Sequence, residues 1–251
     1  MMFRKLIIFL TCFLFSAGLI TCGIDEFFFL PEIPEGNVTR EFNTDATVTI
    51  PNISSEYYAS NYVIFYKIYI SNHQTVSSTD IGQISPSLVY DYNFFNNIID
   101  PANTTTVTSL NTFRNRNYFE LEFEGVEIAN ILPKNGGILS INFPTSPWEN
   151  PTASLDSLNG GKKYELRRSK QLTSCKPSLE DNPYLLNTLE LRSYENATSL
   201  INADVAGRDG DFMDYAYVSM YIVAVGTNPS NFTQIYSKPA HISVFKLSDS
   251  N

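Results

Sequence analysis

Residues 62–70 read Tyr-Val-Ile-Phe-Tyr-Lys-Ile-Tyr-Ile, a run of apolar side chains interrupted by a single charge, Lys67. A half-solvated strand would alternate apolar and polar residues, so an almost unbroken run predicts a central strand that is covered on both faces. Residues 217–225, Tyr-Val-Ser-Met-Tyr-Ile-Val-Ala-Val, form a second run of this kind. The two runs predict buried strands at the centre of a β-sheet fold.

Shorter segments around these runs alternate apolar and polar residues with the period of two that is typical of half-buried strands. They are residues 46–50, 119–123, 139–143, 164–167 and 242–245. In the second of them, Phe119, Leu121 and Phe123 share one face, while Glu120 and Glu122 share the other. The content of 18 Phe and 15 Tyr also favours strands. The sequence therefore predicts an all-β skeleton, in which we find no internal repeat.

One helix is predicted within this skeleton. Ser85 is suited to cap its N-terminus, and Pro86 suits the first helical position. Apolar residues then recur at helical spacing until Pro101 ends the pattern; they are Leu88, Tyr92, Phe95 and Ile99. Because such a stripe is usually core-facing, we expect the helix to cover the sheet as a lid. Residues 178–206 stay open between a short helix and strands.

The N-terminal segment has the order of an export signal. Arg4 and Lys5 precede an apolar run at residues 6–20, and Cys22 follows shortly after it. The run is shorter than the roughly 20 apolar residues that a membrane span requires. We interpret the segment as a lipoprotein signal, and an ordinary cleaved signal or a signal anchor are the alternatives.

Residues 19–22, Leu-Ile-Thr-Cys, resemble the lipobox of bacterial lipoproteins, with Thr21 where Gly, Ala or Ser is usual. Looser lipoboxes of this kind are similar to those of spirochaetes. The resemblance implies that residues 1–21 are a signal peptide and that Cys22 carries two or three acyl chains such as palmitate. Residues 22–40 would tether the body to the cell envelope, at a bacterial membrane that we expect to be the outer one, in either leaflet.

The other cysteines fit this interpretation. Cys12 would leave with the signal peptide, so Cys175 would be a free thiol or an intermolecular link. In a non-lipidated protein, a disulfide between Cys22 and Cys175 is the alternative. Residues 27–29, all Phe, are expected to pack against the body, or else to lie in the lipid headgroup region.

Several pieces of the chain look like strands of a fibronectin type III domain. They are residues 47–51 (strand B), 62–69 (C), 217–226 (F) and 236–239 with 242–245 (G). The Trp that is usual in strand B is missing, because Trp148 is the only Trp of the chain. The chain as a whole also resembles uncharacterised lipoproteins of spirochaetes such as treponemes.

This resemblance implies the fold class. We expect a mainly β, fibronectin type III- or immunoglobulin-like sandwich over residues 41–251. A large β-rich insertion at about residues 72–205 would contain at least one helix. Insertions on a rigid sandwich are where binding commonly resides.

The net charge limits the partners. It is −9, and it becomes −11 once Arg4 and Lys5 leave with the signal. A chain this acidic lacks the basic surface that nucleic-acid binding requires. For the same reason we expect it to contact the membrane through the anchor alone. We expect no cofactor either, since the chain has no Gly-rich phosphate loop.

A short acidic loop precedes the run at 217–225. Asp209, Asp211 and Asp214 lie close together in sequence, and carboxylate oxygens are ligands that Ca²⁺ accepts. Their spacing does not match the EF-hand pattern. The loop is therefore either a calcium site or a solvated turn.

The sequence does not predict a catalytic site. His73 and His241 are the only histidines, no Gly-x-Ser-x-Gly motif accompanies them, and each is expected in a loop or on a strand surface. Glu120 and Glu122 would suit glycoside chemistry, but alternation on a half-solvated sheet is the simpler explanation. We expect that the chain is not an enzyme.

These observations favour a lipid-anchored cell-envelope protein with a non-enzymatic binding or structural role and an unknown ligand. Trp148, flanked by Pro147 and Pro151, would either anchor a protein or glycan partner or fill the core. The first alternative function is a carbohydrate- or solute-binding lipoprotein. The second is an envelope hydrolase, which would need converging polar residues around a competent base.

Overall fold

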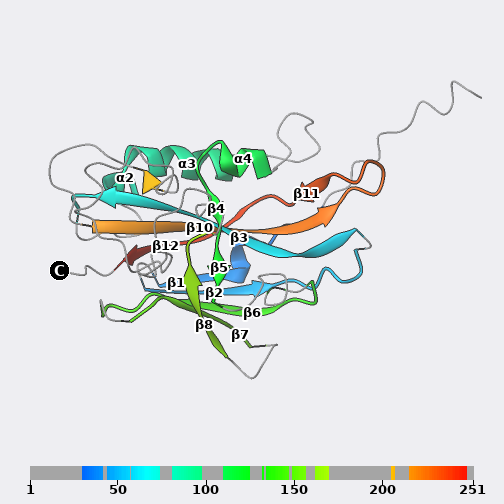
Figure 1. Cartoon of the computed structure of the whole chain (residues 1–251), viewed down its shortest axis with the longest axis horizontal. Coiled ribbons are helices and arrows are strands. Elements are labelled where there is room, and N and C mark those ends of the chain that lie inside the picture. Colours follow the sequence, from blue (N-terminus) through cyan, green and yellow to red (C-terminus); the bar gives the residue numbers. More distant parts are fainter. Residues whose placement is uncertain are drawn as a thin grey trace, which may run out of the picture.

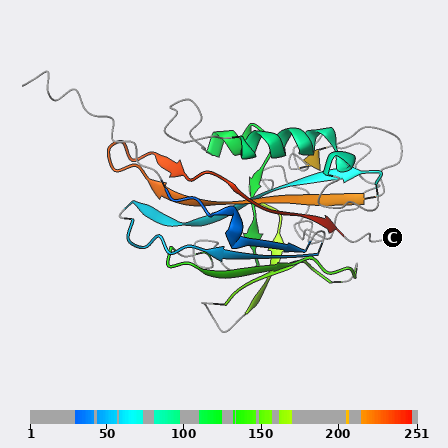
Figure 2. The ribbon, with the colours of Figure 1, turned by 180° about the vertical axis from the view of Figure 1, so that it is seen from behind.

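The computed structural model describes residues 30–41, 44–56, 58–73, 81–97, 110–124, 132, 134–146, 149–156, 162–169, 205–206 and 215–247. Two mainly antiparallel sheets pack face to face, and a layer of helices covers the outer face of one of them (Figure 1; seen from behind in Figure 2). The predicted fold class, a mainly β sandwich with a helix-containing insertion, is confirmed.

The described strands are β1 (Val38–Glu41), β2 (Asp45–Ile50), β3 (Ala59–Ser71), β4 (Phe119–Glu120), β5 (Glu122–Phe123), β6 (Gly137–Asn142), β7 (Thr152–Leu155), β8 (Lys163–Arg167), β9 (Val205–Ala206), β10 (Tyr215–Thr227), β11 (Gln234–Tyr236) and β12 (Ala240–Leu247). The described helical segments are η1 (Glu35–Asn37), α2 (Ile81–Ile84), α3 (Pro86–Asn96) and α4 (Leu110–Arg114). Among the described residues, no helix is long and apolar enough to span a membrane.

The outer sheet has the order β1-β2-β6-β7-β8-β5, and the central sheet has the order β11-β10-β3-β4, with β12 also paired to β10 and β9 to β3. Strand β2 thus lies in one sheet, while β3, β10 and β12 are neighbours in the other. An immunoglobulin-type sandwich distributes its B, C, F and G strands in this way. The predicted insertion, residues 72–205, supplies β5 to β8 and so builds most of the described outer sheet.

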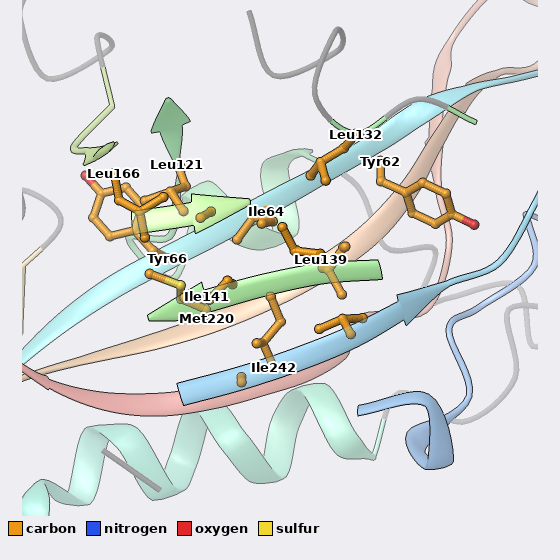
Figure 3. Packing of buried hydrophobic residues seen from close by; sticks show 14 of the residues in the cluster. Tyr62, Ile64, Tyr66, Leu121, Leu132, Leu139, Ile141, Leu166, Met220 and Ile242 are labelled. Atoms are coloured by element: carbon orange, nitrogen blue, oxygen red, sulfur yellow. The ribbon is translucent and has the colours of Figure 1, made fainter. Parts of the chain in front are cut away.

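Alternate side chains of β3 and β10 fill the space between the sheets. Tyr62, Ile64 and Tyr66 of β3 and Met220 of β10 are fully buried there against residues of the outer sheet (Figure 3). The opposed residues Leu139, Ile141 and Leu166, which strand alternation predicts on one face, are buried as well. This apolar contact is the main core of the described molecule.

The segment 119–123 differs from the single strand that its alternation predicts. Its first half, β4, pairs with β3 in the central sheet, and its second half, β5, pairs with β8 in the outer sheet. Leu121, between them, donates its backbone N–H to the carbonyl of Ile64 and is buried. The chain therefore crosses from one sheet to the other, and Glu120 and Glu122 belong to different sheets.

Helix α3 covers the central sheet as predicted. The Ser85 hydroxyl accepts a hydrogen bond from the Ser87 N–H, and Pro86 opens the helix. Leu88 and Phe95 are fully buried against the sheet. The helix ends at Asn96, before the predicted stop at Pro101, and Ile99 lies outside the described residues.

Candidate functional site

A group of polar side chains lies under the helices, on the face of the central sheet that turns away from the outer sheet. Phe65, Lys67 and Tyr69 of β3 share this face. Phe65 belongs to an aromatic cluster in which it stacks on Phe113 of α4, with ring centroids 3.9 Å apart. Tyr69 belongs to a smaller apolar cluster with Leu88. Lys67 is placed between the two clusters.

Asp91 of α3 is the centre of this polar group. Its Oδ2 accepts hydrogen bonds from Lys67 Nζ at 2.6 Å and from the Tyr69 hydroxyl at 2.7 Å. Its Oδ1 accepts from Arg116 Nη1 at 2.8 Å. The Tyr69 and Tyr118 hydroxyls lie 2.9 Å apart and complete the network. Asp91 is 3% exposed, so its charge is compensated by these partners instead of water.

The network holds two cations against one carboxylate. Burial lowers the pKa of Lys67, and the hydrogen bond and charge of Asp91 oppose this shift. Burial raises the pKa of Tyr69 and of Tyr118, which keeps both phenols neutral. The Arg116 guanidinium also lies 3.4 Å from the Phe94 ring centroid and 4.8 Å from that of Tyr90, within the range of cation–π attraction.

A surface hollow of about 620 Å³ opens above this network. Lys67 and Asp91 form its buried part, and the half-buried Arg116 lies at its side. The rim carries exposed residues from α3 and from the turn after α4: Tyr90, Asn115 and Asn117. Tyr90 is 67% exposed, an unusual position for a large aromatic side chain. Asn117 has a φ of 59°, which Asn tolerates better than most residues.

The arrangement suits binding better than proton transfer. A general base must have a lone pair aimed at substrate, whereas the Asp91 carboxylate already accepts from three side chains. The Lys67 ammonium is 7% exposed and held by the same carboxylate. The hollow offers a ligand three things: the Tyr90 ring, the side-chain amides of Asn115 and Asn117, and the excess positive charge of Lys67 and Arg116.

His241 contradicts the expectation of a loop or strand-surface position. It lies on β12, is 8% exposed, and its ring contacts Tyr92 edge-on with centroids 5.1 Å apart. Its Nε2 has no hydrogen-bond partner among the described residues. Burial, and secondarily the charge of Arg40, lowers its pKa to about 3. His73, by contrast, is exposed just after β3, as expected.

A β-bulge explains the position of His241. Along β10, Met220 pairs with Ser243 and the next residue, Tyr221, pairs with His241, so the register skips Ile242. Ile242 then faces the sandwich core, while Val244 joins the cluster under the helices. The alternation predicted for residues 242–245 would place Ile242 and Val244 on one face, and it fails here because one extra residue reverses it.

The residues that sequence analysis proposed as sites lie outside the described residues: Cys22, Trp148, Asp209, Asp211 and Asp214. Within the part that the structure describes, no group of three or more His, Cys, Asp or Glu is placed to hold a metal ion. Glu120 and Glu122 are described. Burial, and to a smaller extent the charge of Glu122, raises the pKa of Glu120. The two carboxylates belong to strands of different sheets, and not to the one strand face that alternation predicts.

The Asp91 network was not predicted from the sequence. One signal for it was available, because a lysine within a buried apolar strand requires a buried partner. Asp91 was a candidate for that partner, since it falls three residues after Leu88 and four before Phe95 on the predicted core face of the helix. Arg116 and Tyr118 follow α4 in a turn and bear no periodic relation to either strand.

Comparisons of the chain with protein-family models, with curated proteins and with solved structures found no match.

Proposed function

We propose that this protein is a lipid-anchored cell-envelope protein with a non-enzymatic binding role, and that its ligand occupies the hollow above Lys67, Asp91 and Arg116. The lipobox-like residues 19–22 support the anchor. Leu30 and Ile33 are buried in the sandwich core, so only residues 23–29 separate Cys22 from the packed body. The body is then held close to the envelope surface.

The observation that carries the binding role is the exposed Tyr90 ring beside an Arg116 guanidinium that is already oriented. Asp91 and Phe94 hold the guanidinium from two sides, so little side-chain freedom is lost when a ligand binds. Local charge then selects the ligand. Two cations against one carboxylate favour an anionic group, although the chain as a whole carries −9.

A carbohydrate ligand is the second candidate. The exposed ring of Tyr90 and the amides of Asn115 and Asn117 line the same hollow, and they favour a hydroxylated ligand with one flat face. An acidic glycan would combine the two, since it carries both an anionic group and a hydroxylated ring. The hollow is open to solvent, so the affinity expected for a single glycan unit is modest.

Lipidation is tested by metabolic labelling with radioactive palmitate in a bacterial host. Label should enter the wild-type chain and not Cys22→Ala. Equal labelling of the two chains, or no labelling of either, would remove the anchor from the proposal.

Ligand binding is tested separately on an array of acidic and neutral glycans, probed with the mature chain. Arg116→Gln should lose most of the signal from acidic glycans, and Tyr90→Ala should lose signal from both kinds. Arg114→Gln is the matched control, because Arg114 is an exposed cation two residues away that does not line the hollow. A signal that all three variants retain would show that the ligand binds elsewhere.

A further inference from the structure

The hairpin between β10 and β11 carries an exposed phenylalanine at its turn. Phe232 is 83% exposed, more than any other large apolar side chain in the described part of the chain. Its φ is +58°, a backbone conformation that bulky residues rarely adopt. A Gly or Asn would meet that conformation at lower cost. An apolar ring at a strained, solvated position calls for a partner that it meets outside the monomer.

The turn holds its shape through its own hydrogen bonds. The N–H groups of Asn228 and Phe232 donate to the carbonyls of Thr233 and Asn228, each at 2.8 Å. The Asn231 side chain accepts from the Thr233 N–H at 3.0 Å and from its hydroxyl at 2.7 Å. Phe232 is therefore presented on an ordered turn.

This hairpin lies beside the first residues of the described chain. The Leu30 side chain packs at Gly226, where an added Cβ would come within 3.2 Å of its Cδ2. Lys238, just after β11, forms an ion pair with Glu32 at 3.7 Å. Figure 2 shows the blue start of the described chain running beside the orange and red hairpin, with the C-terminal end on the opposite side of the molecule.

The position of Leu30 limits how far the hairpin can be from the anchor. Seven residues, 23–29, lie between Cys22 and Leu30, so the two are eight residue steps apart. Such a segment spans at most about 29 Å even when fully extended. A bilayer that holds Cys22 is therefore within reach of the hairpin end of the sandwich, and less accessible to the opposite end.

The turn itself carries no charge. Residues 227–236 contain no Asp, Glu, Lys or Arg, although the chain carries a net charge of −9. An acidic body is repelled by anionic lipid, but an uncharged turn with one aromatic ring is not. Aromatic side chains are favoured at the boundary between lipid headgroups and acyl chains.

We propose that the β10–β11 turn is a membrane-contact element, and that Phe232 inserts into the surface of the bilayer that holds Cys22. The inference rests on the proposed lipid anchor and goes beyond it, because the lipid alone would leave the body free to rotate. A second contact orients the sandwich with its hairpin end toward the membrane. It also departs from the expectation that membrane contact is confined to the anchor.

The test uses the mature lipidated chain in phosphatidylcholine vesicles with acyl chains brominated to quench tryptophan emission. One variant combines Trp148→Phe with Phe232→Trp, and its matched control combines Trp148→Phe with Tyr90→Trp. Both replaced positions are exposed aromatic side chains, but Tyr90 lies on helix α3 away from the hairpin. If Trp148→Phe prevents folding, the same pair with Trp148 retained gives the same comparison, because the emission of Trp148 is common to both.

Flotation with the vesicles reports the anchor, and quenching reports the turn. We expect both variants to float. The Phe232→Trp variant should show a blue-shifted emission and severalfold stronger quenching than the Tyr90→Trp variant. Flotation with equal quenching of the two variants would overturn the membrane contact and leave the anchor intact. A mature chain that does not float would overturn both proposals.

Discussion

The two faces of the central sheet differ although the same strands build them. Toward the outer sheet, β3 and β10 present apolar and aromatic side chains such as Ile64, Met220 and Ile222. Toward the helices they present polar groups as well, including Lys67 and Tyr69, which are both hydrogen-bonded to the Asp91 carboxylate. The first face is stabilised by buried apolar area and by the volume that its side chains fill, so many apolar sequences could form it. The second is stabilised by a specific set of hydrogen bonds, and it is the face that carries the hollow.

Removal of the Asp91 carboxylate, at the centre of the helix-covered face, should destabilise the protein more than any other change proposed below. We expect Asp91→Ala to lower the free energy of unfolding by about 3–5 kcal/mol, because it leaves Lys67 as a buried charge without its counter-ion. Urea unfolding monitored by circular dichroism measures the change.

The matched double variant tests the cause. Lys67→Met with Asp91→Leu removes the buried Lys67–Asp91 ion pair and leaves only Arg116, which is half-buried and can be solvated. This double variant should recover most of the stability that Asp91→Ala loses, because apolar groups of similar size often replace buried ion pairs at little cost. A double variant as unstable as Asp91→Ala would show that packing of the helix, and not the unpaired lysine, accounts for the loss.

The sandwich face should respond to volume alone. Ile222 is fully buried between the sheets, and Ile222→Ala should cost about 2–5 kcal/mol while Ile222→Val costs about 0.5–1.5. The same urea titration measures both. In the Asp91 network a second substitution, Lys67→Met, should restore stability. No such second substitution exists for Ile222, because it has no charged partner to remove. Equal losses for Val and Ala would contradict a volume-dependent contact.

This difference explains how much of the molecule could be predicted from its sequence. Leu139, Ile141 and Leu166 are buried as their alternation predicts, since burying one face of a strand requires only a period of two. The start of α3 could be predicted from Ser85 and Pro86, because capping is a local property.

The candidate site depends on contacts between distant parts of the chain, and such contacts leave no period. Asp91 and Lys67 are 24 residues apart, and Asp91 and Arg116 are 25. Their meeting is decided by how α3 and the turn after α4 lie on the sheet. His241 was misplaced for a similar reason, since the bulge opposite Met220 and Tyr221 is a feature of pairing and not of local composition.

Acidification should weaken the helix-covered face through His241. Its pKa is lowered from 6.5 to about 3 by burial, so below pH 6.5 the unfolded chain binds a proton that the folded chain excludes. Stability therefore rises with pH in this window and falls by up to about 1.4 kcal/mol for each pH unit on acidification toward 3. The rings of Tyr92 and Tyr221 pack against the imidazole, and the Arg40 guanidinium, which donates to the His241 backbone carbonyl, is the charged group that adds to the lowering of its pKa.

Thermal unfolding between pH 4 and 7 measures this contribution as the difference between wild type and His241→Phe. The wild-type melting temperature should fall more steeply than that of the variant as the pH is lowered. His73→Gln is the control, because His73 is exposed and its loss should leave the slope unchanged. Parallel curves for wild type and His241→Phe would show that the buried imidazole does not titrate with unfolding.

The smallest effect should come from the cap that positions α3, and with it Asp91, over the sheet. Ser85→Ala removes the hydroxyl that accepts from the Ser87 N–H at 3.2 Å, and should cost about 1 kcal/mol. Ser87→Ala is the matched control, since Ser87 contributes only its backbone N–H to the cap and its side chain is exposed; it should stay within about 0.5 kcal/mol of wild type.

If Ser85→Ala also weakens the coupling between Lys67 and Asp91 in a double-mutant cycle, the cap transmits its effect to the polar network. An unchanged coupling would show that the buried residues Leu88 and Phe95 hold the helix in place by themselves.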